Sequence, residues 1–543
     1  MHWADQIARE VKARVEKDET LKKIVKEKGY IVYDEKTPSG IIHIGSGRGW
    51  VIHDAIAKAM RDMGLKAKFI LSSDDMDPYD KPNTDLPKSF DKYIGMPFRN
   101  IPSPEKGYKN FADYYFSQVT DKFKDFGIEA ELESTGERYE KGDFNKAIKT
   151  ILDNADKVND IFERLYENRP KKLPFNPICE KCGKIGTTLA YEWDKEREVI
   201  KYRCEENLVK WAKGCNHEWE MSPYNGNGKL PWKVEWAAKW PTVGVVCELA
   251  GKDHFTHGGS RSVAIAVSDE VLDFPPPYPS TRKDIGKGYE FFTVGGKKMS
   301  TSKGTGIGFA EATDYAPAKI LRYLLVATRP HAALDFNPSN RNDMILLYDR
   351  FDKTERIYYK KEDADKNQYE QQKRIYELSH IGKIGKKMPV QIQFSFAATI
   401  MQVALSHDKA IELLKQLGHL PEKIPKEDLT YLKERLNYAE KWVNEFAPEE
   451  YRFKVQEKTT EKVAGKEKEA VEKLVGYLKD HKKVDEKLLY EEFYNISKSV
   501  GIDTKDFFKV CYRILIGKDK GPRLAPFIVT IGKDKVVSLL RQI

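Results

Sequence analysis

The sequence predicts an α/β protein, with a doubly wound, Rossmann-like parallel sheet in its N-terminal part and an all-helical C-terminal half. An apolar run at residues 30–33 precedes a glycine-rich turn and a helical pattern that begins near Trp50. Apolar residues then recur at helical spacing as far as Met63, and Gly64 supplies a left-handed stop. A second strand candidate follows at 69–71. This order is the βαβ unit that opens such a sheet, and its turn favours phosphate binding.

The composition indicates a large protein without membrane or secretion signals. Its 543 residues predict three or four domains, and the net charge of +9 permits a polyanionic partner or simply a solvated Lys/Glu surface. No apolar run approaches a spanning helix and the start lacks the plan of a signal peptide, so we expect a cytoplasmic protein. The sequence does not give the oligomeric state, and a monomer is our expectation.

Two segments rich in glycine and positive charge predict a nucleotide site. Residues 37–49 contain four glycines together with His43 and Arg48, which can donate hydrogen bonds to anionic oxygens. The spacing fits neither common phosphate-binding fingerprint, so this segment alone is weak evidence. A second, strongly cationic segment flanked by glycines follows at 295–304. Together the two segments predict a clamp that holds a nucleotide from both sides.

The remaining segments carry weaker local patterns. Residues 1–28 predict an amphipathic helix, and residues 84–115 a loop-rich region without a period. A helical pattern covers 116–170, with one segment closed by Gly127, and helices dominate beyond about 316. One later helix has the apolar face Leu489, Phe493, Ile496 and Val500 and should end at Gly501.

Four of the six cysteines are grouped in a way that indicates a metal site. Two residues separate Cys179 from Cys182, which is the Cys-x2-Cys spacing, and a second group, Cys204 and Cys215, follows about twenty residues later. Four soft ligands in two groups fit a tetrahedral structural Zn2+ site. Either Cys215 or His217 could close it. We favour Cys215, with His217 as the reserve ligand.

The two nucleotide segments carry a family resemblance. The run His43-Ile44-Gly45-Ser46 resembles the His-Ile-Gly-His motif of class I aminoacyl-tRNA synthetases, and Lys298-Met299-Ser300-Thr301-Ser302 resembles their Lys-Met-Ser-Lys-Ser loop. Thr37-Pro38-Ser39-Gly40, residues 251–254 and residues 289–291 are similar to the class I lysyl-tRNA synthetases in particular. The resemblance implies activation of L-lysine with ATP and Mg2+, followed by transfer to the 3′ end of tRNA(Lys).

The resemblance also implies roles for individual residues. The catalytic groups are His43, Lys298 and Lys303. The ATP-binding residues are Pro38, Gly40, His43, Gly45, Ser46, Arg48, Lys298, Met299, Ser300, Ser302 and Lys303. The lysine-binding residues are Thr37, Ser39, Asp75, Trp232, Asp253, His254 and Tyr289. Trp232 has core packing as its alternative, and we expect Trp236 and Trp240 to be structural. The chain departs from the family at 34–36, where Asp-Glu-Lys replaces small residues beside the expected α-amino position.

The expected organisation is a catalytic domain over 1–315, a helical connecting domain over 316–390 and an anticodon-binding domain over 391–543. The first contains an insertion at about 84–250 with a zinc-binding segment at 175–220. Three other functions remain open: a class I synthetase for Glu or Cys, a small-molecule adenylyltransferase, and an inactive RNA-binding relative. The adenylyltransferase would not need the helical half, and intact lysines in the cationic loop disfavour the inactive relative.

Overall fold

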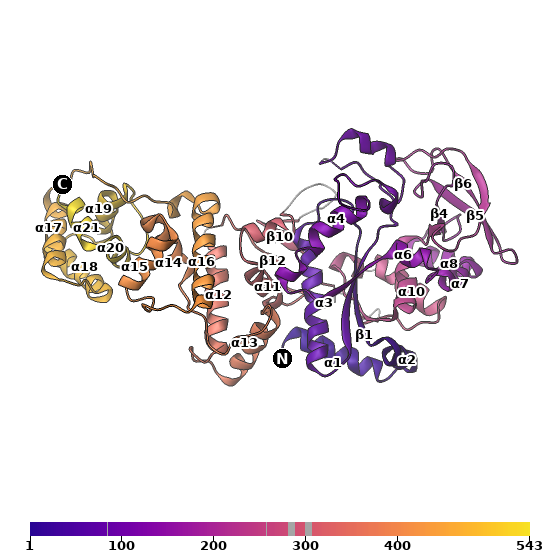
Figure 1. Ribbon diagram of the computed structural model, residues 1–543, viewed down its shortest axis with the longest axis horizontal. Coiled ribbons are helices and arrows are strands. Elements are labelled where there is room, and N and C mark those ends of the chain that lie inside the picture. The colour runs from indigo at the N-terminus through magenta and orange to yellow at the C-terminus, as the bar shows by residue number, and fades with distance from the viewer. Residues whose placement is uncertain (84, 257, 281–287, 299–306, 341) are drawn as a thin grey trace. The chain divides into compact units, whose positions relative to one another are not determined.

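The computed structural model describes residues 1–543 except 84, 257, 281–287, 299–306 and 341 (Figure 1). The chain forms two compact units. Unit 1 comprises Met1–Asp314, Ala318–Phe336 and Ala364–Ile384, and unit 2 comprises Tyr315–Pro317, Asn337–Asp363 and Gly385–Ile543. No helix of the described residues has the length and apolar character needed to cross a membrane.

Unit 1 is organised around a four-stranded parallel sheet, as predicted. Its order is β3-β2-β1-β9, and each neighbouring pair is parallel. The strands are β1 (Tyr30–Lys36), β2 (Ala67–Ser73), β3 (Ala130–Ser134) and β9 (Val245–Cys247). The chain leaves β1 toward β2 on one side and reaches β9 on the other, so β1 is the switch point at which doubly wound sheets bind their ligands.

Strand β3 was not predicted, because residues 116–170 had been interpreted as helical. It is the edge strand, and its Glu131, Leu132 and Glu133 are all exposed or half-buried, Leu132 to 48%. A strand without a buried face leaves no apolar alternation in the sequence. Strands β3 and β9 both lie within 84–250, so that region is not one continuous insertion into the sheet.

Helices formed by the N-terminal residues of the chain lie beside the sheet (Figure 1). Residues 1–28 form two helices instead of one, α1 (Trp3–Val15) and α2 (Glu19–Lys28), because the Asp18 side chain accepts from the Leu21 N–H and caps a new helix. Helix α3 (Ile44–Asp62) packs on β1 and β2, and α1 packs on α3. Gly64 has φ +79° after α3, which confirms the predicted stop.

Between β2 and β3 lie two short 3-10 turns, Lys88–Tyr93 and Phe98–Asn100, and helices α4 (Phe111–Thr120) and α5 (Phe123–Phe126). Three helices follow β3: α6 (Thr135–Glu140), α7 (Asn145–Asp153) and α8 (Ala155–Tyr166). Two small antiparallel sheets come next, one formed by β4 (Asn176–Pro177) and β8 (Gly228–Lys229) and the other by β5 (Thr188–Asp194), β6 (Val199–Cys204) and β7 (Glu218–Met221). Helix α9 (Trp232–Lys239) and the π-turn Trp240–Gly244 then lead to β9. This second region carries the four grouped cysteines.

Unit 1 continues with the 3-10 turn Lys252–Phe255, α10 (Ser260–Glu270), β10 (Phe292–Val294), β11 (Lys297–Lys298), the 3-10 turn Glu311–Asp314, α11 (Ala318–Ala327), β12 (Leu334–Asp335) and α13 (Lys366–Ser379). Helices α11 and α13 pack on each other and both contact α3. Strand β10 pairs with β11 in antiparallel and with β12 in parallel orientation.

Unit 2 is helical in its described residues, as predicted. Its helices are α12 (Asp343–Tyr358), α14 (Phe394–Ala404), α15 (His407–Gln416), α16 (Lys426–Lys441) with the π-turn Trp442–Phe446, α17 (Gly465–Asp480), α18 (Glu486–Val500), α19 (Thr504–Ile516), α20 (Leu524–Ile531) and α21 (Lys533–Leu540), with a 3-10 turn at Glu449–Tyr451. The predicted apolar face of α18 is buried in the core of the last five helices, and Gly501 ends that helix at φ +68°.

Candidate active site

The His-Ile-Gly segment lies beside the chain that follows the cationic loop. His43 occupies the N-cap position of α3 and forms an isolated backbone bridge with Gly308. The Ile44 N–H donates to the Ile307 carbonyl at 2.9 Å. The start of the His-Ile-Gly motif is therefore joined through the backbone to the segment that follows the cationic loop, as a clamp that closes from two sides requires.

The cationic loop itself is only partly described. Lys298 lies in β11, and its backbone pairs with Thr293 of β10. The predicted ATP-binding residues Met299, Ser300, Ser302 and Lys303 lie outside the described residues, so their roles stay predictions. The same is true of the role of the Lys298 side chain.

Helix α3 starts six residues before the expected position near Trp50, because the glycines belong to its first turns. A Cβ on Gly47 would lie 2.4 Å from the Phe309 ring, and a Cβ on Gly49 would lie 2.7 Å from the Tyr289 hydroxyl. These glycines therefore let the helix start pack closely against distant segments of the chain. Sequence periodicity missed this stretch because glycine contributes no apolar signal.

Arg48 faces the protein interior. Its side chain is fully buried, and its two terminal nitrogens donate to five backbone carbonyls at 2.7–3.1 Å. The acceptors are Glu290, Phe291, Arg329, Pro330 and Ala332. Burial lowers the pKa of Arg48 to about 10. Arg48 was expected to bind ATP. The guanidinium instead donates to backbone carbonyls, so we no longer count Arg48 among the ATP-binding residues.

A cavity of about 610 Å3 opens at the carboxyl end of β1. Of the residues expected to bind lysine or ATP, it is lined by Thr37, Ser39, Ser46, Trp232, His254 and Tyr289. Pro38 and Gly40 are buried and do not line it. The cavity therefore lies at the switch point of the sheet, beside the start of α3, where an open α/β sheet binds its ligands.

Aromatic side chains form one side of the cavity. Trp232 is 47% exposed, which excludes the alternative that it is a core residue. The His254 ring is perpendicular to both Trp232 and Trp236, with centroid distances of 6.3 and 5.3 Å. Trp240 is fully buried and donates to Glu248 at 2.6 Å, which agrees with its expected structural role. Trp236 both lines the cavity and donates to Glu248.

Six charged side chains form a connected group on another side of the cavity, which we call the ion cluster. Lys229 donates to Asp74 at 3.0 Å and to Asp77 at 2.5 Å, and it contacts Glu235 at 3.0 Å. Lys239 contacts Glu235 at 3.0 Å and also binds Glu35. The ion cluster is therefore Glu35, Asp74, Asp77, Lys229, Glu235 and Lys239.

The ion cluster is buried, and its carboxylates have divergent pKa values. Burial raises the pKa of Glu35 to about 8 and that of Asp77 to about 7, the latter helped by the charge of Asp74. Burial also opposes ionisation of Asp74, but Lys229 and Lys239 hold its pKa below the ordinary value. Glu35 and Asp77 therefore retain protons near neutral pH, whereas Asp74 is an anion.

Two predicted lysine-binding carboxylates are placed elsewhere. Asp75 does not line the cavity. It accepts from the Gly136 N–H at 2.7 Å and the Ser134 hydroxyl at 2.6 Å, so it joins the end of β2 to the start of α6. Asp253 is exposed and also lies outside the cavity lining. The geometry thus supports neither as the acceptor of a substrate ammonium.

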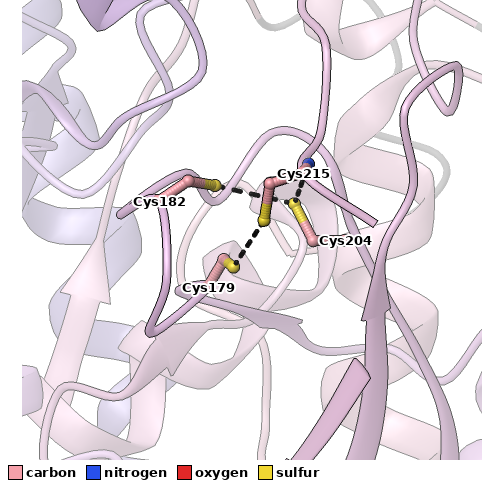
Figure 2. Close-up of side chains that lie close together, drawn as sticks. All are labelled: Cys179, Cys182, Cys204 and Cys215. Carbon is pink, nitrogen blue, oxygen red and sulfur yellow. Dashed lines mark hydrogen bonds between the residues drawn. The ribbon is translucent and has the colours of Figure 1, made fainter. Parts of the chain in front are cut away.

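The four grouped cysteines come together in space (Figure 2). All four sulfur atoms lie within 4.8 Å of one another, with Cys179 and Cys215 3.6 Å apart and Cys182 and Cys204 3.7 Å apart. Four sulfurs at about 2.3 Å from a tetrahedral zinc would be separated by about 3.8 Å. His217 instead contacts Glu180 at 3.1 Å, so Cys215 is the fourth member of this group. The donor set and its spacing fit Zn2+.

The fold and motif arrangement define the class of protein. A parallel sheet carries a His-Ile-Gly helix start at its switch point, joined to the segment that follows a Lys-Met-Ser loop. This is the arrangement of a class I aminoacyl-tRNA synthetase. Two family models match the chain, "tRNA synthetases class I (K)" over residues 1–382 and "Anticodon binding domain" over residues 396–543.

Curated relatives match over the full length. The lysine–tRNA ligase of Methanosphaera stadtmanae is 32% identical over 99% of this chain and 99% of its own. That of Methanocaldococcus jannaschii is 33% identical over 99% of both, and that of Pyrococcus horikoshii is 31% identical over 100% of this chain and 99% of its own. The chain therefore belongs to the class I lysyl-tRNA synthetase family.

Proposed function

We propose that the protein is a lysine–tRNA ligase that forms lysyl-adenylate and pyrophosphate from L-lysine and ATP and then transfers lysine to the 3′ end of tRNA(Lys). The observation that carries this proposal is the backbone junction between His43 and Gly308 beside an aromatic and acidic cavity. The full-length similarity to lysine–tRNA ligases supports it. Such a reaction belongs to translation, which supports a cytoplasmic location.

The chemistry needs positioned cations and no protein base, because the attacking lysine carboxylate is already an anion. Charge develops on the α-phosphate and on the leaving pyrophosphate, where preorganised donors stabilise the transition state. We assign this role to His43 and to Lys298 and Lys303 of the cationic loop. Gly45 presents a backbone N–H group at the α3 start, and Ser46 lines the cavity there. Mg2+ on the phosphates of ATP would supply further neutralisation of their charge.

We propose domain roles along the division expected from the sequence. We assign residues 1–315 to catalysis, 316–390 to connection with the tRNA stem and 391–543 to anticodon recognition, with the anticodon-domain match over 396–543 as support. Exposed Tyr490 and Tyr494 on α18 are candidates for base stacking, the usual mode by which single-stranded RNA bases are bound.

ATP–pyrophosphate exchange with each of the twenty amino acids tests the proposal, followed by tRNA charging with the amino acid that is active. We expect exchange with lysine alone. Exchange with glutamate or cysteine would favour another class I synthetase, and exchange without charging would favour a small-molecule adenylyltransferase.

The variant Lys303→Ala should reduce exchange by about tenfold or more without changing the melting temperature.

We propose that Cys179, Cys182, Cys204 and Cys215 hold one structural Zn2+, with no open position for a substrate. Metal analysis of the purified protein should return one zinc per chain. Cys179→Ser should lose that zinc and lower the melting temperature, whereas His217→Ala should retain it. Zinc retained by Cys179→Ser and lost by His217→Ala would contradict the assignment.

A further inference from the structure

The cavity has more carboxylates than its internal cations occupy. Its described lining includes six acidic residues, and four of them contact a lysine or arginine of the protein. Glu35, Asp74 and Asp77 bind the lysines of the ion cluster, and Glu248 lies 3.4 Å from Arg261. The two left are Asp34 and Asp80. Asp80 is exposed, so Asp34 is the enclosed carboxylate among them.

Asp34 has polar contacts but no cationic partner among the described residues. Its side chain is 15% exposed, and Oδ1 accepts from the Glu35 N–H at 2.8 Å. Oδ2 lies 3.4 Å from Nδ1 of His53, whose proton is donated to the Gly49 carbonyl at 2.7 Å. Burial lowers the pKa of His53 to about 4, so this ring is neutral. Lys36, on the same strand, acts on Asp34 only from beyond ion-pair distance.

The space beside Asp34 is shaped by Gly49. From the position that a Cβ on Gly49 would occupy, the Asp34 Oδ2 lies 3.1 Å away and the Tyr289 hydroxyl 2.7 Å away. Two oxygen atoms therefore flank one point at which the chain carries no side chain. Burial raises the pKa of Tyr289, which keeps its hydroxyl neutral and able to accept a hydrogen bond.

We propose that Asp34 is the specificity-determining carboxylate of this site and that it binds the ε-ammonium of lysine together with the Tyr289 hydroxyl. The inference rests on the proposed function and deepens it. An ammonium has three donors and no acceptor, which matches a carboxylate and a hydroxyl. Trp232, Trp236 and His254, from the aromatic side, enclose the apolar stem of the substrate. Asp34 thus replaces Asp75 and Asp253 as the carboxylate expected to bind lysine.

The ion cluster explains why the other carboxylates do not compete for the substrate. Asp74 already contacts Lys229 and Glu35 already contacts Lys239 within the protein. An amino acid of equal length with a neutral end would leave Asp34 buried and unpaired, and an unpaired buried charge is costly. Asp34 thus selects for a positive charge at the end of the side chain.

ATP–pyrophosphate exchange with L-lysine and with L-2-amino-6-hydroxyhexanoate, which carries a hydroxyl in place of the ammonium, tests this assignment. The enzyme should prefer lysine. Asp34→Asn should lower kcat/KM for lysine by about 10- to 100-fold, with little change for the hydroxyl analogue or in KM for ATP. Asp80→Asn is the matched control, since Asp80 also lines the cavity but is exposed, and it should keep the preference.

The outcomes separate the inference from the proposed function. The inference alone would be overturned if the parent enzyme shows lysine-dependent ATP–pyrophosphate exchange and the Asp34→Asn variant keeps the full preference for lysine over the hydroxyl analogue. A parent enzyme without lysine-dependent exchange would overturn both. Thermal melting reports whether the variant folds. If Asp34→Asn does not fold, the Tyr289→Phe variant is used in the same assay. Loss of the hydroxyl should lower kcat/KM for lysine and leave kcat/KM for the analogue unchanged.

Discussion

Glu35 and Asp34 are neighbours on β1, yet they occupy opposite electrostatic situations. Glu35 belongs to the ion cluster, where it binds Lys239 and accepts from the Thr135 hydroxyl at 2.8 Å. Asp34 points to the other face of the strand, since successive side chains alternate, and has no cation of the described chain within ion-pair distance. A carboxylate that contacts a cation of the protein is already occupied, whereas one without such a contact is available to a substrate.

The largest expected effect comes from breaking the ion cluster. Lys229→Met removes the ammonium that contacts Asp74, Asp77 and Glu235, and should lower the free energy of unfolding by about 3–5 kcal/mol at pH 7. Denaturant unfolding measures the change. The control Lys201→Met removes only an exposed pair with Glu192 and should change stability little. Equal effects of the two variants would show that the ion cluster has no special stabilising role.

A second prediction uses pH to sharpen the contrast. Burial raises the pKa of Asp34 to about 7 in the absence of substrate. The carboxyl is neutral below that pKa and ionised above it, so the affinity for lysine should rise about tenfold from pH 6 to pH 8. Calorimetric titration with lysine measures the affinity.

Other titratable groups lie near Asp34, so that titration needs a control. They are Lys36, Glu35, Glu248, Tyr289 and His53, and the pKa of Glu35, about 8, lies in the same range. Asp34→Asn should remove the rise in affinity if Asp34 causes it. A rise that persists in this variant would assign the effect to Glu35 of the ion cluster.

The smallest expected effect concerns the aromatic side of the cavity. Trp232→Ala should raise KM for lysine about fivefold and leave KM for ATP unchanged, because a half-exposed aromatic face contributes about 1 kcal/mol to a bound cation and its stem. The melting temperature should stay near that of the parent, since 47% of Trp232 is exposed. A lower melting temperature without a selective rise in KM for lysine would contradict the role of Trp232 in lysine binding.

The sequence predicted the features that depend on local pattern or on short spacing. The βαβ unit, the stop at Gly64 and the grouping of Cys179 with Cys182 each follow from residues close together in the chain. The order of the two nucleotide motifs also sufficed to predict that their segments meet. Local signals of this kind need no knowledge of distant packing.

Features set by distant contacts were not predictable. Arg48 is a charged residue in a glycine-rich segment, and only segments more than 240 residues away provide the carbonyls that turn it inward. Asp75 and Asp74 are adjacent in sequence, yet their different partners, Gly136 and Lys229, decide which one lines the cavity. Asp34 lies where the chain departs from the family, and the sequence alone does not show that Lys239 contacts its neighbour Glu35 and leaves Asp34 without a cation among the described residues.

The long span of the Arg48 hydrogen bonds affects how the protein is made. Ala332, which accepts the shortest of these bonds, follows Arg48 by 284 residues, and Val326 accepts from Trp3 across 323 residues. Translation proceeds at about 5–20 residues per second, so Ala332 is synthesised roughly 15–55 s after Arg48. The nucleotide-binding end of the sheet is therefore among the last parts of unit 1 to be completed during translation, although its residues are among the first to be synthesised.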